Sequence, residues 1–117
     1  MEFDPLRKIL LNKKASSEDL PFGPDALVFK VLGKIFAIIA WNDNPLSISL
    51  KCEPNHALAL RTIFPAVKPG YHLNKDHWNT VTLDGTIADK EIIDMINHSY
   101  DQVVKSFSKA DKEKLKH

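Results

Sequence analysis

The sequence has 117 residues, of which 44% are hydrophobic and 26% charged, so it fits one globular domain over residues 1–117 with a single core. It contains no apolar run of about 18 residues and no signal-peptide pattern, so we expect a soluble, cytoplasmic protein without a membrane partner. The net charge of +1 argues against a protein that coats nucleic acid by charge alone, because that mode needs many lysines and arginines.

The first half of the chain predicts one helix followed by an antiparallel meander. Asp4 followed by Pro5 is typical of a helix start, and this helix is expected to reach about Lys14. The stretch SSEDLPFGPD is rich in turn formers and predicts a loop. Two apolar runs, ALVFKVL and KIFAIIAW, divide at Leu32-Gly33, where glycine permits a tight hairpin. The alternation in LSISLK then predicts a third strand.

The second half predicts two more helices around one or two strands. Glu53-Pro54 opens a short helix that should end at Phe64, because proline follows. TVTLD alternates like a half-buried strand. A capping box at Thr86 is expected to precede the longest helix, over residues 88–108. This order predicts an α+β fold, an antiparallel sheet with helices packed on one face.

The long helix has a continuous apolar face that identifies the core. We expect four of its residues to be buried, namely Ile92, Ile96, Tyr100 and Val103. Their expected partners on the strands are Val31, Phe36, Ile38 and Leu50 or the strand neighbours of these residues.

Charge is distributed unevenly along the chain. Residues 26–83 carry six lysines and arginines against three acidic residues, whereas residues 84–104 carry five acidic residues and one lysine. One face of the molecule could therefore attract an anion.

The stretch PGYHLNKDHWNTVTLDG, residues 69–85, raises the question of a catalytic or metal site. His72 and His77 would point to opposite faces of a strand, and only a turn could join them with Asp76 around a metal ion. A single cysteine, Cys52, makes a Cys-based zinc site unexpected and is typical of a small buried hydrophobe. No catalytic motif is present. We therefore predict no enzyme activity, no metal site and no cofactor.

Other residues of this stretch have plain structural interpretations. Asn74 and Asn79 are typical turn formers. Trp78 could be a core residue or a platform on which a base stacks, and we favour the core because a small domain needs large side chains inside.

Several motifs in one order resemble the MmcQ/YjbR family: LPFG, FKVLGKIFAII, ISLKCEP, PGYHLNKDHWNTVTLDG and INHSYDQVV. The resemblance covers residues 20–104. It implies a frataxin-like (CyaY-like) two-layer α+β sandwich and a DNA-binding protein with a double-wing motif. The family's recurrent positions fall here on Phe22, Gly23, Lys30, Gly33, Lys34, Phe36, Leu50, Lys51, Pro54, Pro69, Gly70, His72, Asn74, Lys75, His77, Trp78, Val81, Ser99 and Tyr100.

The two wings implied by this resemblance would be the hairpin tip at Gly33 and the loop that follows Gly70. Their candidate nucleic-acid-binding residues are Lys30, Lys34, His72, Asn74, Lys75 and His77. The only arginines, Arg7 and Arg61, lie outside both wings, so binding should be directed to phosphate with weak sequence selectivity. Protonation of the two histidines should tighten binding at lower pH.

Other functions stay open at this point. Iron binding, suggested by the frataxin-like shape, is disfavoured because the acidic residues are spaced along a helix rather than clustered. A non-enzymatic module for protein interaction or for a small anionic ligand is the main alternative. A basic ridge across both loops would favour nucleic acid, whereas a closed pocket at Lys75, His77 and Trp78 would favour a ligand. The choice between DNA and RNA stays open, and a monomer is expected.

Overall fold

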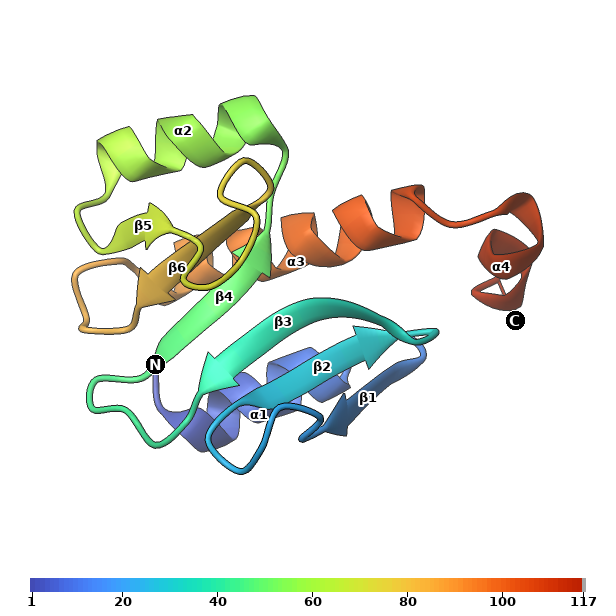
Figure 1. Ribbon diagram of the computed structural model, residues 1–117, viewed down its shortest axis with the longest axis horizontal. Helices are drawn as coiled ribbons and strands as arrows, with labels where there is room; N and C mark the ends of the chain where they lie inside the picture. Colours follow the sequence, from blue (N-terminus) through green and yellow to red (C-terminus); the bar gives the residue numbers. More distant parts are fainter. Residues whose placement is uncertain (117) are drawn as a thin grey trace.

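The computed structural model describes residues 1–116, and this part of the chain forms a six-stranded antiparallel sheet with four helices (Figure 1). The strands are β1 (Ser16–Asp19), β2 (Leu27–Val31), β3 (Lys34–Ala40), β4 (Ser47–Lys51), β5 (Val67–Pro69) and β6 (Trp78–Thr82). The helices are α1 (Phe3–Leu11), α2 (Pro54–Ile63), α3 (Asp89–Lys105) and α4 (Lys109–Lys114). The sheet order is β1-β2-β3-β4-β6-β5. The predicted α+β fold is confirmed.

The core lies between the sheet and helices α1 and α3, which Figure 1 shows behind the strands. Leu6 and Leu10 of α1 and Ile96 of α3 are completely buried there. Helix α2 packs beside β5 and β6 and adds Ala57 and Leu60 to the same core. Helix α4 lies beyond the end of α3, away from the sheet.

A β-bulge in β3 decides which side chains reach the core. Phe29 pairs with Ala37 and Lys30 pairs with Ile35, so Phe36 is the extra residue of β3. Phe36 and Ala37 are both buried on the helix side as a result, and the alternation after them is reversed. Of the expected core partners, Ile38 itself faces the opposite side of the sheet, and its strand neighbours Ala37 and Ile39 are buried in the core instead.

The element boundaries differ from the predictions at several ends. Helix α1 stops at Leu11 instead of reaching Lys14, and β1 occupies part of the stretch predicted as a loop. The capping box at Thr86 is wrong: the N-cap of α3 is Ala88, and Thr86 bonds the side chain of Asp84 instead.

The structure also shows how α2 begins and where α3 ends. The Glu53 carboxylate accepts hydrogen bonds from the backbone of Asn55 and His56, which caps α2 and lowers the pKa of Glu53. Helix α3 ends at Lys105, and the chain then turns into α4 rather than continuing to Ser108. Tyr100 is half-buried, with its hydroxyl donating to the carbonyl of Lys14.

Within residues 1–116, no helix combines the length and the apolar composition needed to cross a bilayer. The frataxin-like detail of the fold stays a prediction.

Candidate functional site

The loop between β5 and β6, residues 70–77, is built around a close approach of two backbones. Gly70 N–H donates to the carbonyl of Trp78 over 2.8 Å. A Cβ atom on Gly70 would lie 2.7 Å from Trp78 Cβ, so only glycine fits. Asn74 Oδ1 accepts a hydrogen bond from Asp76 N–H, which is the turn-forming role predicted for it. The loop is therefore shaped by its own sequence.

Arg61 of α2 clamps this loop from outside. Its Nε donates to Asn79 Oδ1 over 2.7 Å, and its Nη2 donates to the carbonyls of Lys75 and Trp78. Asn79 is buried and donates in turn to the Ala57 carbonyl of α2. Asn79 is thus a core polar residue that links helix and strand, not a turn former.

A polar groove of about 490 Å³ runs between this loop and the end of α3. We call it the basic groove. Its lining residues are Lys51, Asn74, His77, Trp78, Gln102, Lys105 and Ser106. Two of the predicted binding residues, Asn74 and His77, thus meet two lysines that the wing hypothesis did not include.

Lys34, a predicted wing residue, adjoins the basic groove. Its Nζ donates to Ser106 Oγ over 3.4 Å and lies 5.1 Å from the centre of the Phe107 ring. The hairpin tip therefore reaches the end of α3, and α3 connects the two predicted wings. The carbonyl end of a helix carries partial negative charge, which Lys34 and Lys105 offset.

The remaining predicted residues lie elsewhere. Lys75 donates to the Gly70 carbonyl across its own loop. Lys30 pairs with Asp19 at 3.7 Å on the other side of the hairpin. His72 lines a different groove, described below. The structure thus brings together three of the six predicted residues, Lys34, Asn74 and His77.

Trp78 is half-buried and lines the basic groove, so the preferred prediction of a core tryptophan is wrong. The reason is its register in β6: Trp78 lies on the same face as Thr80 and Thr82, whereas the alternate residues Asn79 and Val81 are the ones that enter the core. Part of the ring stays accessible from the groove.

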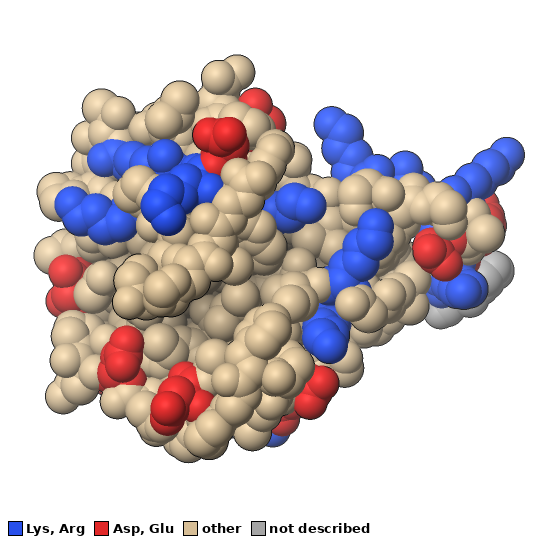
Figure 2. Space-filling model, in the orientation of Figure 1, with Lys and Arg blue, Asp and Glu red and all other residues tan. Residues whose placement is uncertain are grey.

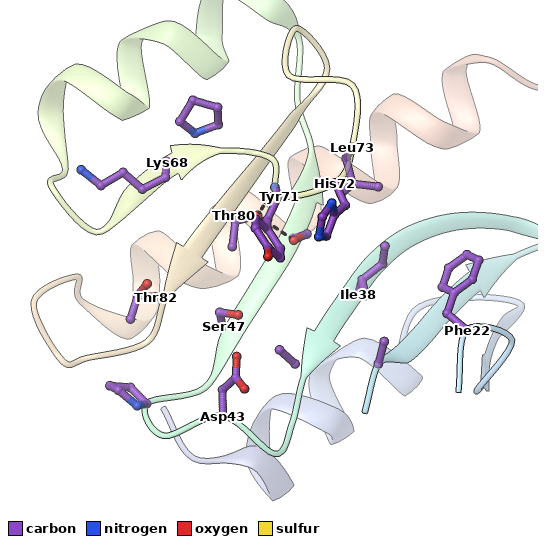
Figure 3. A pocket seen from close by; sticks show the side chains of 15 residues that line it. Phe22, Ile38, Asp43, Ser47, Lys68, Tyr71, His72, Leu73, Thr80 and Thr82 are labelled. Carbon is purple, nitrogen blue, oxygen red and sulfur yellow. Dashed lines mark hydrogen bonds between the residues drawn. The ribbon is translucent and has the colours of Figure 1, made fainter. Parts of the chain in front are cut away.

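A second groove, of about 780 Å³, lies on the sheet face opposite α1 and α3. We call it the open-face groove. Its floor includes Ser47 and Thr80, and its sides include Phe22, Ile38, Tyr71 and His72 (Figure 3). Tyr71 is 73% exposed and Phe22 is 66% exposed, so two aromatic rings stand at its rims. Every lining residue comes from a strand or a loop.

His72 is held in an unusual backbone conformation at this groove. Its φ of 59° lies in the left-handed region that residues with side chains seldom adopt. Its ring lies 4.0 Å from the Tyr71 ring, centre to centre. Figure 3 shows both rings on the side of the groove that faces Ile38 and Phe22.

Charged residues are unevenly distributed over the surface. In Figure 2, lysines and arginines gather over α2, β5 and the 70–77 loop and again toward the end of α3, with a few acidic residues beside them, while further acidic residues lie along the lower edge. The hollow between them, which corresponds to the open-face groove, is mostly uncharged.

Sequence reasoning missed Lys51, Gln102 and Lys105 as groove residues. Lys51 stood among the recurrent positions of the resemblance, and that was its only signal. No local pattern relates Lys105 to Asn74, because the groove that both residues line forms where α3 ends beside the loop. Within residues 1–116, the metal-ligating atoms of His72, Asp76 and His77 do not form a cluster, whereas those of Cys52, His56 and His98 lie close together.

A family model described as YjbR matches residues 11–102. The uncharacterized protein YbdF of Escherichia coli O157:H7 is 38% identical over 96 residues, which cover 82% of this chain and 79% of that protein. The uncharacterized protein YjbR of Escherichia coli strain K12 is 34% identical over 104 residues, covering 89% of this chain and 88% of that protein.

Solved structures agree with the fold. A crystal structure of the Deinococcus radiodurans protein DR2400, described with a DUF419 domain, matches with a TM-score of 0.92 and 40% identity. The match covers 97% of this chain and 87% of the Deinococcus radiodurans chain. A crystal structure of a Pseudomonas syringae protein matches with a TM-score of 0.75 and 29% identity, covering 87% of this chain and 98% of that one.

Proposed function

This chain belongs to the YjbR family, and from that premise we propose that it binds nucleic acid, DNA in the first place, through the basic groove. The relatives are named as uncharacterized proteins, so the proposal depends on the geometry of the groove. It keeps Lys34, Asn74 and His77 from the predicted set and adds Lys51 and Lys105.

The observation that carries the proposal is the convergence of separate cationic side chains around one half-buried aromatic ring. Lys51 ends β4, Lys105 ends α3, and Lys34 follows the hairpin tip, yet all three lie at one groove or its edge. Trp78 forms part of its wall. Grooves that bind nucleic acid usually combine two components: lysines placed along the path of the phosphate backbone, and an aromatic ring on which a base can stack.

The contacts should be mainly to phosphate. Arg61 is engaged in the loop clamp through Nε and Nη2, and Arg7 is paired with Glu18. Neither is free for the two-bond contact to guanine that gives sequence selectivity. Lysines act as point charges, so weak selectivity follows. A nucleic-acid partner and an unpaired cysteine both suit the cytoplasm, where we place the protein.

A salt-series binding assay with duplex DNA, single-stranded DNA and RNA tests the proposal. Lys105→Gln should weaken binding to all sequences alike and lower the salt slope by about one unit. The matched control is Lys90→Gln, which removes an exposed lysine from the other end of α3. Equal losses in the two variants, or no salt-dependent binding of the wild-type protein, would reject the basic groove.

A second candidate function is the binding of a small anionic aromatic molecule in the open-face groove. The groove has the size of ligand pockets, and it combines exposed aromatic rings with His72 and Lys68. Anilinonaphthalene sulfonate, an anionic aromatic dye, is a suitable probe. Tyr71→Ala should reduce its fluorescence enhancement, whereas Leu58→Ala, which removes an exposed apolar residue of α2, should not.

A further inference from the structure

Three side chains with metal-ligating atoms meet where β4, α2 and α3 come together. Cys52 follows β4, His56 lies in the first turn of α2, and His98 lies in the middle of α3. One ligand atom from each lies within 4.8 Å of the other two. The two imidazole rings are 4.7 Å apart, centre to centre. None of these residues belongs to the basic groove or to the open-face groove.

The backbone holds this cluster in place. Cys52 N–H donates to the His77 carbonyl over 2.8 Å, and Glu53 N–H donates to His98 Nε2 over 3.1 Å. The second bond requires His98 Nε2 to carry no proton, and it engages the lone pair of that nitrogen, so a metal ion that binds Nε2 takes the place of the Glu53 N–H. The Glu53 carboxylate fixes the start of α2 and with it the backbone of His56.

We propose that Cys52, His56 and His98 form a zinc site with water at the fourth position. Zinc prefers four ligands, with bonds of about 2.3 Å to sulfur and about 2.0 to 2.1 Å to nitrogen. Tetrahedral angles then separate the ligand atoms by roughly 3.3 to 3.6 Å. Closing the cluster from its present spacing therefore needs a shift of about 1 Å. His56 is exposed and can supply that shift by rotating its side chain.

The donor set selects the metal. One thiolate and two imidazoles suit zinc, whereas magnesium and calcium prefer oxygen ligands. A cysteine binds zinc as the thiolate, so zinc binding at Cys52 releases the thiol proton to solvent.

This site differs from the cysteine-rich zinc sites that the sequence argues against. Those sites are recognised in a sequence by two or more cysteines at fixed spacing. Here Cys52 and His56 are four residues apart, and the fold brings His98 of α3 to them from far along the chain. An open fourth position is typical of zinc ions that activate a water molecule, whereas purely structural sites are closed.

Cobalt titration of the full chain tests the site, because Co²⁺ replaces Zn²⁺ and reports its ligands by absorption. A single equivalent of Co²⁺ should produce a sulfur-to-metal charge-transfer band and the visible bands of a tetrahedral ion, and Zn²⁺ should bleach both. His56→Ala should weaken Co²⁺ binding at least about tenfold. This variant removes an exposed side chain and should fold normally, so it keeps the test valid even if Cys52→Ser is unstable.

The matched control is His77→Ala, which removes another exposed histidine while keeping the backbone carbonyl that Cys52 bonds. It should leave the cobalt spectrum unchanged. The site is rejected if wild-type protein shows no charge-transfer band, or if His56→Ala and His77→Ala bind Co²⁺ equally well. The outcome is independent of nucleic-acid binding, because the titration contains no nucleic acid and the test variant His56→Ala alters no residue of the basic groove.

Discussion

Ser99 of α3 donates a hydrogen bond to the carbonyl oxygen of Phe36 over 2.5 Å, in a completely buried position. Phe36 is the bulged residue of β3, so its carbonyl is released from the regular strand pairing. The same hydroxyl accepts a hydrogen bond from Lys51 N–H over 2.9 Å. One small side chain thus satisfies backbone groups of two neighbouring strands, and it locks α3 onto the bulge.

Replacement of Ser99 by alanine should therefore be costly for its size. It leaves the Phe36 carbonyl and the Lys51 N–H unsatisfied, and each such buried group costs about 1 to 3 kcal/mol. We expect Ser99→Ala to lower the free energy of unfolding by about 2 to 4 kcal/mol in urea denaturation. Ser17→Ala, an exposed serine of β1, should change it by about 0.5 kcal/mol or less. Similar values for the two variants would contradict this role.

The Arg61 clamp should control the order of the 70–77 loop. Arg61→Ala removes three hydrogen bonds and leaves the buried Asn79 amide without its donor. We expect a loss of about 1 to 3 kcal/mol of stability and faster amide hydrogen exchange within the loop. Arg7→Ala, which removes the other arginine, should leave exchange in the loop unchanged. Unaltered loop exchange in Arg61→Ala would show that the loop holds its own shape.

The ion pair between Arg7 and Glu18 should make the attachment of β1 depend on pH. The hydrogen bond from Arg7 lowers the pKa of Glu18 in the folded protein. A lowered carboxylate pKa stabilises the fold above the unfolded value of about 4.3, and this stabilisation is lost as pH falls through the lowered folded pKa.

A double-mutant cycle with Arg7→Gln and Glu18→Gln measures that coupling. Both side chains are partly exposed, so the coupling free energy at neutral pH should be small, and added salt should reduce it. It should disappear in acid. A coupling that stays constant from neutral to strongly acidic pH would mean that the ion pair does not contribute.

Trp78 should report directly on the basic groove. In the variant Trp41→Phe, Trp78 is the only tryptophan. Duplex DNA should then change the fluorescence of Trp78, and added salt should reverse the change, because the Trp78 ring forms part of the groove wall. In the matched variant Trp78→Phe, the remaining Trp41 lies outside the groove, bonded to the Pro24 carbonyl, and should not respond. DNA binding with a silent Trp78 would place the contact elsewhere.

Local patterns were sufficient for most elements of this fold. The alternation of LSISLK identifies β4, with Ile48 and Leu50 buried as expected. The apolar face of residues 92–107 identifies α3, with Ile92, Ile96 and Val103 in the core. The Glu53-Pro54 start of α2 is also confirmed. These features depend on residues that are close in sequence, because helix and strand periods act over a few positions.

The tertiary structure decided which side chains meet. The bulge at Phe36 reverses the alternation of β3 and turns Ile38 to the open face, and its carbonyl is satisfied from α3, far along the chain. The basic groove combines Lys51 with Lys105, and the proposed zinc site combines Cys52 with His98. Contacts of this kind depend on strand pairing, on where α3 ends and on how α2 packs, and no local period encodes them.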